Sequence, residues 1–190
     1  MQKGALQSLG SRIFYPVLVV GSLVMSGCAT GPVPVNYAPS SVKTATGALS
    51  VGDFKYLPSE AAAAKPVPSN VIRNTAMGEI KIDRDVKVFV RDAVFAELRF
   101  VGIKTNDGSK ILTGEIEEFL VDDLGYSIDW TLRVNYSLTE VASNKVIYQS
   151  VKNTQRKTAK FVNAFGALNE TIKLNAEQLL DDAEFVKAIN

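Results

Sequence analysis

Acidic residues gather in one short stretch of the chain, and closely spaced carboxylates are side chains that could perform chemistry. Glu115, Glu117 and Glu118 lie close together, with Asp122 and Asp123 just beyond them. A pair of carboxylates can act as general acid and base in glycoside hydrolysis. In a strand, however, Glu115 and Glu117 would share one face while Glu118 took the other, and no apolar neighbours are evident that would raise a pKa. A solvated strand face is the favoured interpretation, and no catalytic residue is predicted.

Composition removes most other catalytic and metal-binding chemistry. The 190 residues include no histidine and one cysteine. Histidine-dependent catalytic triads and histidine-based metal sites are therefore excluded, and a single cysteine forms neither an intrachain disulfide nor a cysteine-rich zinc site. Asp122 and Asp123 also lack the regularly spaced oxygen ligands of an EF-hand loop. We predict a protein that is not an enzyme and that has no cofactor and no metal.

The charge balance argues against nucleic acid as a partner. Lys and Arg together number 21, and Asp and Glu together number 20. Binding to phosphate backbones needs a basic face, which so even a balance does not suggest. The stretch from Lys152 to Thr158 (KNTQRKT) is locally basic and could meet lipid phosphates. An exposed strand end is the favoured interpretation of that stretch.

The single cysteine follows a segment typical of exported bacterial proteins. Lys3 and Arg12 give a basic start, and an apolar run follows from Ile13 to Met25. A membrane-spanning helix needs about 20 apolar residues, so this run fits a signal peptide better than a span. Together with Met25, the next residues, Ser26-Gly27-Cys28, resemble the lipobox of bacterial lipoproteins. The resemblance implies that residues 1–27 are removed and that Cys28 receives a diacylglycerol thioether and an N-acyl chain.

Two alternatives for this segment are an ordinary signal peptide with a free or buried cysteine, and an uncleaved membrane anchor. The residue after the cysteine is Ala29. In the enterobacterial sorting pattern that this resembles, Asp at that place retains a lipoprotein in the inner membrane. Ala29 therefore favours the outer membrane, with the body of the protein in the periplasm.

Residues 28–48 are expected to be the lipidated cysteine and a flexible tether. From Thr30 to Ala48 the chain is rich in Pro, Gly, Ser and Thr and shows no period. A flexible chain of about twenty residues has a mean span of ~25 Å. Such a tether would hold the following domain clear of the lipid headgroups.

Residues 49–190 are predicted to form a single folded domain organised around one strand. Between Tyr126 and Leu138 every second residue is large and apolar, and the residues between them are polar. The apolar set is Tyr126, Ile128, Trp130, Leu132, Val134, Tyr136 and Leu138. Because successive side chains of a strand point to opposite faces, this pattern predicts one buried and one solvated face. The aromatic residues could instead line a lipid groove, although at this period they are more often core.

Two amphipathic helices are predicted to cover the buried face of that strand. In the first, apolar residues recur every three or four positions from Val86 to Val101, after a cap at Asp83 or Asp85 and before a helix-ending Gly102. In the second, the same spacing holds from Leu168 to Ile189, and a break is expected at Asp181-Asp182.

Shorter apolar runs complete the predicted sheet. Strands are expected at 49–56, with a bulge at Gly52, and at 79–82, 111–121 and 146–154. The connection at 57–78 contains an alanine run and two prolines and is expected to be a mobile surface loop. The predicted fold class is α+β, a two-layer sandwich in which an antiparallel meander sheet is covered on one face by two helices.

Four sequence markers accompany this order of elements. They are the lipobox at Cys28, Arg84-Asp85-Val86 at the start of the first helix, Gly102-Ile103 after it, and Phe185-Val186 in the closing turn. With the strand meander, they resemble the YajG-type family of Gram-negative lipoproteins over most of the mature chain, although the insert at 57–78 departs from that family. The family has no assigned activity, so the resemblance implies a location rather than a reaction. A similar layout in the lipopolysaccharide-assembly lipoprotein LptE and in auxiliary lipoproteins of lipid-transporting ABC systems is an analogy of fold alone.

The sequence therefore favours a non-enzymatic lipoprotein held at the outer membrane by lipid on Cys28. Its periplasmic domain is expected to bind a protein partner in assembly or maintenance of the cell envelope. The alternative is an accessory subunit that handles lipid or lipopolysaccharide, which requires an apolar groove between helix and sheet, open to solvent. A third hypothesis is a hydrolase that depends on carboxylates such as Glu117, for which no substrate can be proposed.

Overall fold

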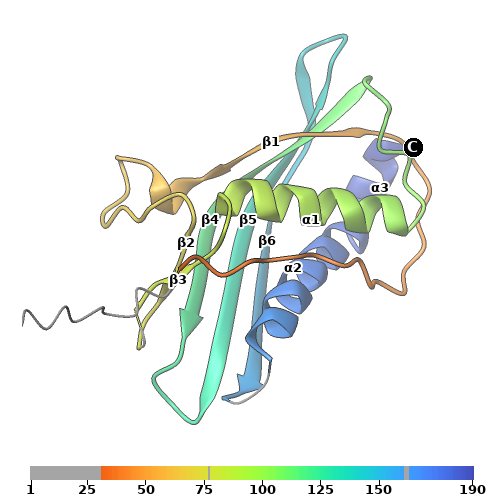
Figure 1. The fold of residues 1–190 in the computed structure, drawn as a ribbon. Coiled ribbons are helices and arrows are strands. Elements are labelled where there is room, and N and C mark those ends of the chain that lie inside the picture. The colour runs from red at the N-terminus through yellow and green to blue at the C-terminus, as the bar shows by residue number, and fades with distance from the viewer. Residues whose placement is uncertain (1–30, 77, 161–162) are drawn as a thin grey trace, which may run out of the picture. The chain divides into compact units, whose positions relative to one another are not determined.

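In the computed structural model, a long central strand, β5 (Ser127–Glu140), organises a mixed sheet (Figure 1). The structure describes residues 31–76, 78–160 and 163–190, and within them the sheet has six strands in the order β3-β2-β4-β5-β6, with β1 also paired to β4. Strands β4 (Lys110–Asp122) and β6 (Lys145–Ala159) flank β5 in antiparallel pairing. This arrangement confirms the predicted meander.

Strand β1 (Ser50–Tyr56) confirms the strand expected at 49–56, but it pairs with β4 in parallel rather than antiparallel register. The register of the pair shifts between Val51 and Phe54, which confirms the irregularity that Gly52 predicted. A side-chain carbon at Gly52 would lie 2.8 Å from Ile111 Cγ2, so glycine permits the close approach of the two strands.

The connection at 57–78 is more ordered than expected. It opens with a short 3₁₀ turn, Leu57–Ser59, and contains strand β2 (Val71–Asn74), which runs parallel to β4 and is paired with the short strand β3 (Ile80–Lys81). The prediction of a mobile loop is therefore wrong for β2. Its first two residues are buried, but four residues are too few to show a recognisable period.

Three helices pack on one face of the sheet (Figure 1), which confirms the two-layer α+β sandwich. They are α1 (Val86–Phe100), α2 (Ala164–Leu180) and α3 (Ala183–Ile189). The break between α2 and α3 confirms the one expected at Asp181-Asp182, because the Asp182 carboxylate accepts a hydrogen bond from the Glu184 N–H and begins α3. Gly102 ends α1 with φ of 108°, a conformation that favours glycine. Among the described residues, no helix is both long and apolar enough to cross a bilayer.

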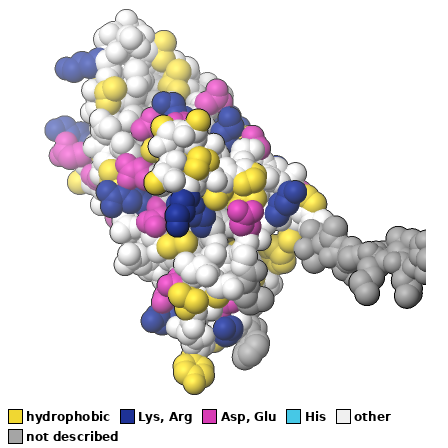
Figure 2. All heavy atoms as spheres, turned by 90° about the vertical axis from the view of Figure 1, so that its left-hand side faces the viewer, with side chains coloured by type: hydrophobic (Ala, Val, Ile, Leu, Met, Phe, Trp, Pro, Cys, Tyr) yellow, Lys and Arg dark blue, Asp and Glu magenta, His cyan; other side chains and the backbone are white. Residues whose placement is uncertain are grey.

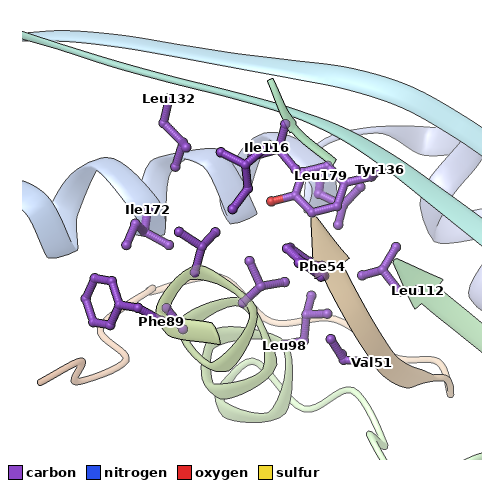
Figure 3. Close-up of a cluster of buried hydrophobic side chains, with 14 of the residues drawn as sticks. Val51, Phe54, Phe89, Leu98, Leu112, Ile116, Leu132, Tyr136, Ile172 and Leu179 are labelled. Carbon is purple, nitrogen blue, oxygen red and sulfur yellow. The ribbon is translucent and has the colours of Figure 1, made fainter. Parts of the chain in front are cut away.

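The hydrophobic core lies between the helices and the sheet, as Figure 3 shows. From the sheet, Leu132 and Tyr136 point toward Ile172 and Leu179 of α2 and toward α1. Five of the seven apolar residues predicted for the β5 face are buried: Trp130, Leu132, Val134, Tyr136 and Leu138. Ile128 is partly buried against the core.

Tyr126 corrects the predicted pattern at its first position. It lies before the start of β5, in the turn after β4, and its side chain is fully exposed. Alternation along a strand carries no information about a residue that the strand does not contain. The exposed position of Tyr126 is therefore a separate feature of the surface.

Residues 31–48 do not form the free tether that was expected. The Val33 N–H donates to the Lys81 carbonyl at 2.8 Å, and the Val33 carbonyl accepts from the Asp83 N–H at 3.0 Å. Farther along, the Ala45 N–H donates to the Val101 carbonyl at 2.9 Å, and Val35 is buried. The folded unit therefore begins at Gly31 rather than at residue 49. We call residues 33–46 the strap.

Candidate functional site

The acidic cluster lies on the sheet face that points away from the helices. The Lys55 ammonium donates to Glu115 at 2.9 Å, and the Arg133 guanidinium donates to Glu117 at 2.5 Å. A bulge in β4 between Ile116 and Glu118 sets Glu118 opposite Arg133, on this same face. The prediction that Glu118 takes the other face is therefore wrong, because the extra residue of the bulge shifts the alternation by one.

The ion pairs explain what these carboxylates do in the fold. A general acid for glycoside hydrolysis needs surroundings that keep its proton on at neutral pH. Glu115 and Glu117 are instead each held by a cation on a partly exposed surface. These two carboxylates therefore belong to a solvated, ion-paired strand face, as the favoured interpretation of the sequence predicted.

Asp122 and Asp123 brace the turn between β4 and β5. One oxygen of Asp122 accepts hydrogen bonds from the Thr75 hydroxyl at 2.6 Å and from the Leu124 N–H at 3.2 Å. Asp123 is buried, and its carboxylate lies 3.1 Å from the Lys160 ammonium. Within the described ranges, no group of three or more acidic or cysteine side chains is arranged to hold a metal ion.

A groove runs along β4 on the open face of the sheet. Two adjoining cavities, of about 480 and about 300 Å³, share Pro58, Arg73 and Glu117 in their walls. The alanine run at 62–64 forms one side of the larger cavity, and Arg133 lines the smaller one. We call these two cavities together the β4 groove.

The β4 groove offers charges of both signs beside small apolar side chains. The Arg73 guanidinium donates to the carbonyl of Lys65, and the Arg133 guanidinium is held by Glu117, so both arginines are oriented before any ligand arrives. Guanidinium groups pair well with carboxylates, and arginine is enriched at protein interfaces. Figure 2 shows basic, acidic and hydrophobic side chains interspersed over the surface that it faces, without a large patch of one kind. Such a surface suits a polypeptide better than an acyl chain.

The basic stretch from Lys152 to Thr158 does not form one basic surface. It lies in β6, so its side chains alternate between the two faces of the sheet. On the helix side, Lys152 lies 2.6 Å from Asp182, and the Arg156 guanidinium donates to the Ala167 carbonyl at 3.3 Å. On the open side, Lys157 lies 3.5 Å from Asp129. Ion pairs within the domain therefore engage much of this charge.

One of these pairs makes a pH-dependent contribution to stability. Hydrogen bonds from Lys152 and Tyr148 lower the pKa of Asp182 from 3.8 to about 2. Because the pKa is lower in the folded state, this stabilisation is present above pH 4 and is lost as the pH falls toward 2. We expect Asp182→Asn to lower the free energy of unfolding by about 1–2 kcal/mol at neutral pH, after allowance for solvent screening, while the amide still caps α3.

Denaturant unfolding between pH 7 and pH 3 measures this difference. It should shrink as the pH falls below about 4, because the aspartate of the unfolded chain then takes up a proton, while that of the folded protein, with a pKa of about 2, does so only at lower pH. The matched control is Asp181→Asn, which removes a more exposed ion pair with Lys43 and should change stability by less than about 0.5 kcal/mol. A constant difference between Asp182→Asn and the unmodified protein at all pH values would contradict the assignment.

Sequence reasoning missed Glu97, which is fully buried on α1. One of its oxygens accepts from the Tyr37 hydroxyl at 2.6 Å and from the Ser40 N–H at 2.9 Å, and the other accepts from the Ser41 N–H at 3.2 Å. Glu97 thus fastens the strap to the helix. The available signal was a charged residue on the apolar stripe of α1, four positions before Val101.

The strap also contacts α2, so it joins two of the three helices that pack on the sheet, α1 and α2 (Figure 1). The Ser41 hydroxyl donates to Glu177 at 2.6 Å, and the Asn169 amide donates to the Asn36 carbonyl at 2.9 Å. Burial, with the nearby Glu97 carboxylate, raises the pKa of Tyr37 far above its usual range. The Tyr37 hydroxyl therefore stays protonated and remains a donor at any physiological pH.

No family model and no curated protein matches this chain. Among solved structures, the chain is similar to protein XCC0632 from Xanthomonas campestris, of the family DUF330. The two sequences are 13% identical, the match covers 81% of this chain and 94% of that one, and the TM-score is 0.59. It is also similar to the hypothetical protein CT253 from Chlamydia trachomatis, with 10% identity over 76% and 99% of the two chains and a TM-score of 0.52. At such identities the likeness shows the fold alone.

Bacterial lipoproteins are among the looser matches. One is lipoprotein GNA1162 from Neisseria meningitidis, with 8% identity over 72% of this chain and 99% of that one and a TM-score of 0.40. A score this low adds nothing to the argument about fold. The YajG-type family is not among the matches named here, and Cys28 lies outside the described residues. The chain thus has the two-layer α+β fold of the Xanthomonas protein, without a family assignment from these comparisons.

Proposed function

We propose that this chain is a lipoprotein of the YajG type, anchored in the outer membrane through lipid on Cys28. Its periplasmic domain binds a protein partner in assembly or maintenance of the cell envelope and catalyses no reaction. The anchor is supported by the basic start, the apolar run and the lipobox that precede Cys28. The partner role is carried by one observation, the β4 groove with its two oriented arginines.

The competing proposal, a subunit that handles lipid or lipopolysaccharide, needs an apolar groove between helix and sheet. On β5 the side chains that would line it are buried in the core, among them Trp130 and Tyr136. The Tyr136 hydroxyl is also held by Asn175 of α2 at 2.8 Å. A lipid would have to separate α2 from the sheet and break this contact, so the partner-binding role is better supported.

Site-specific photo-crosslinking in cells that make the protein tests this proposal. A photoreactive residue at Glu118, an exposed member of the β4 groove, should capture one defined envelope protein. The matched control position is Gln149, which is exposed on β6 and is not among the residues that line the groove. Adding Arg73→Ala should weaken the capture at Glu118, because it removes one of the two oriented guanidinium groups.

Cys28→Ala is the control for the anchor. This variant should leave the membrane fraction and lose the mass of its acyl chains, since two or more chains are needed for stable anchoring. Equal crosslinking from Glu118 and Gln149, or recovery of uncrosslinked monomer from both, would count against the partner role. Unchanged membrane attachment of Cys28→Ala would count against the anchor.

A further inference from the structure

The two arginines of the β4 groove differ in what holds them. The Arg133 guanidinium donates to the carboxylate of Glu117, so its charge is neutralised within the domain. The Arg73 guanidinium donates instead to the carbonyl of Lys65, which is neutral. Among the residues that the structure describes, no ion pair joins Arg73 to a carboxylate. Arg73 therefore keeps a positive charge that a ligand in the groove can neutralise.

Arg73 lies where the sheet is interrupted beside β4. On the outer side of β4, strand β1 pairs as far as Ile116 and strand β2 pairs from Leu120 onward. Within the described ranges, no strand pairs with β4 on this side between those two residues, and residues 117–119 line the smaller cavity there. The groove is thus a gap between two strands, and an extended segment of another chain can lie along it.

The wall of the groove that follows β1 is held in place by its own hydrogen bonds. The Val67 N–H donates to the Pro58 carbonyl at 2.9 Å, which closes the loop, and the Ala63 N–H donates to the Glu60 carbonyl at 3.0 Å. The Arg73 guanidinium ties the same loop to β2. A ligand does not have to order this wall when it binds, which favours binding.

The acidic residues of the groove distinguish a carboxylate ligand from a phosphate monoester. Glu60 lines the larger cavity, Glu118 lines the smaller one, and Glu117 lines both. A phosphate monoester carries a charge of about −1.5 to −2 at neutral pH, whereas a carboxylate carries a single negative charge. Repulsion from the three glutamates grows with the charge of the ligand. The groove therefore favours one carboxylate beside Arg73.

We propose that the partner presents an acidic residue within an extended segment, and that its carboxylate pairs with Arg73 in the β4 groove. This inference rests on the proposed function and names the chemistry of its partner. A guanidinium group holds a carboxylate through two parallel hydrogen bonds, which fixes the position of the acidic residue. Small apolar residues next to it lie against the alanine run at 62–64.

Nuclear magnetic resonance of the full-length, acylated protein in detergent micelles tests this pairing. The protein carries isotope-labelled arginine, and the probe is the peptide acetyl-Ala-Glu-Ala-amide. The Nε–H signal of Arg73, identified by its absence from Arg73→Lys, should shift saturably with a Kd of about a millimolar, the range expected of so small a ligand. Arg84 is the internal control, because Asp83 already holds its Nε at 3.1 Å, and its signal should not move.

Two further peptides show which group Arg73 recognises. Acetyl-Ala-Gln-Ala-amide has the same shape without the charge and should bind at least about tenfold more weakly, as expected for the loss of a hydrogen bond between charged groups. Acetyl-Ala-phosphoserine-Ala-amide should also bind more weakly than the glutamate peptide. Equal binding of the glutamine peptide, or tighter binding of the phosphoserine peptide, would overturn the choice of a carboxylate.

The outcomes separate this inference from the proposed function. If the glutamate peptide leaves the Arg73 signal unmoved while crosslinking from Glu118 still captures an envelope protein, the pairing with Arg73 is overturned and the partner role stands. If the peptide shifts Arg73 saturably but crosslinking in cells captures no protein, the groove does take a carboxylate, and it is the partner role that fails. A shift of Arg73 matched by an equal shift of Arg84 would show unspecific attraction between charges and would overturn the inference.

Discussion

Replacing Leu132 with aspartate should leave the domain unfolded at room temperature. Leu132 is fully buried in the middle of β5 and lies between Phe119 of β4 and Thr154 of β6. Removing a buried leucine side chain costs roughly 2–5 kcal/mol, and leaving a carboxylate without a partner in the core adds several more. The sum is comparable to the whole stability of a typical domain, about 5–15 kcal/mol. Far-UV circular dichroism and thermal melting measure the loss.

The neighbouring residue provides the matched control. Thr131 lies on the open face of the same strand and is partly exposed, so Thr131→Asp should change stability by less than about 1 kcal/mol. Trp130 would be a weaker test than Leu132, because Arg156 lies directly across from it and could pair with a new carboxylate. A cooperative melting transition for Leu132→Asp near that of the unmodified protein would mean that this face of β5 does not organise the core.

Much of this architecture could be predicted because it follows from periodic patterns. Apolar residues alternate with polar ones along β5 and recur every three or four positions along α1 and α2. Each pattern repeats several times, so a single exception does not hide it. The break at Asp181-Asp182 and the end of α1 at Gly102 could be predicted from local capping chemistry. Both signals depend only on near neighbours in the sequence.

The features that were missed depend on contacts between distant residues. The strap has no period and is held by Glu97, which lies 57 residues from Ser40. The bulge in β4 is a matter of pairing with β5, and it reversed the face predicted for Glu118. The β4 groove likewise joins Arg73, Glu117 and Arg133 from three strands. No local pattern could have brought these side chains together.

The second large effect is expected at Glu97, which holds the strap on α1. Glu97→Ala should release residues 33–46 from the helices, because the Tyr37 hydroxyl and the N–H groups of Ser40 and Ser41 would lose their acceptor in a buried site. Each hydrogen bond to a charged group contributes roughly 1.5–3 kcal/mol. The loss of stability should be smaller than the sum, about 2–4 kcal/mol, because the freed strap can move into water and regain its hydrogen bonds there.

Hydrogen exchange and limited proteolysis distinguish release of the strap from general destabilisation. Amides of residues 33–46 should exchange faster and the strap should become cleavable, while β5 stays protected. Asp92→Ala is the matched control, since Asp92 lies on the same helix, is paired with its neighbour Arg91 and is partly exposed. Uniformly faster exchange in β5 and the strap would show that Glu97 serves the core rather than the strap.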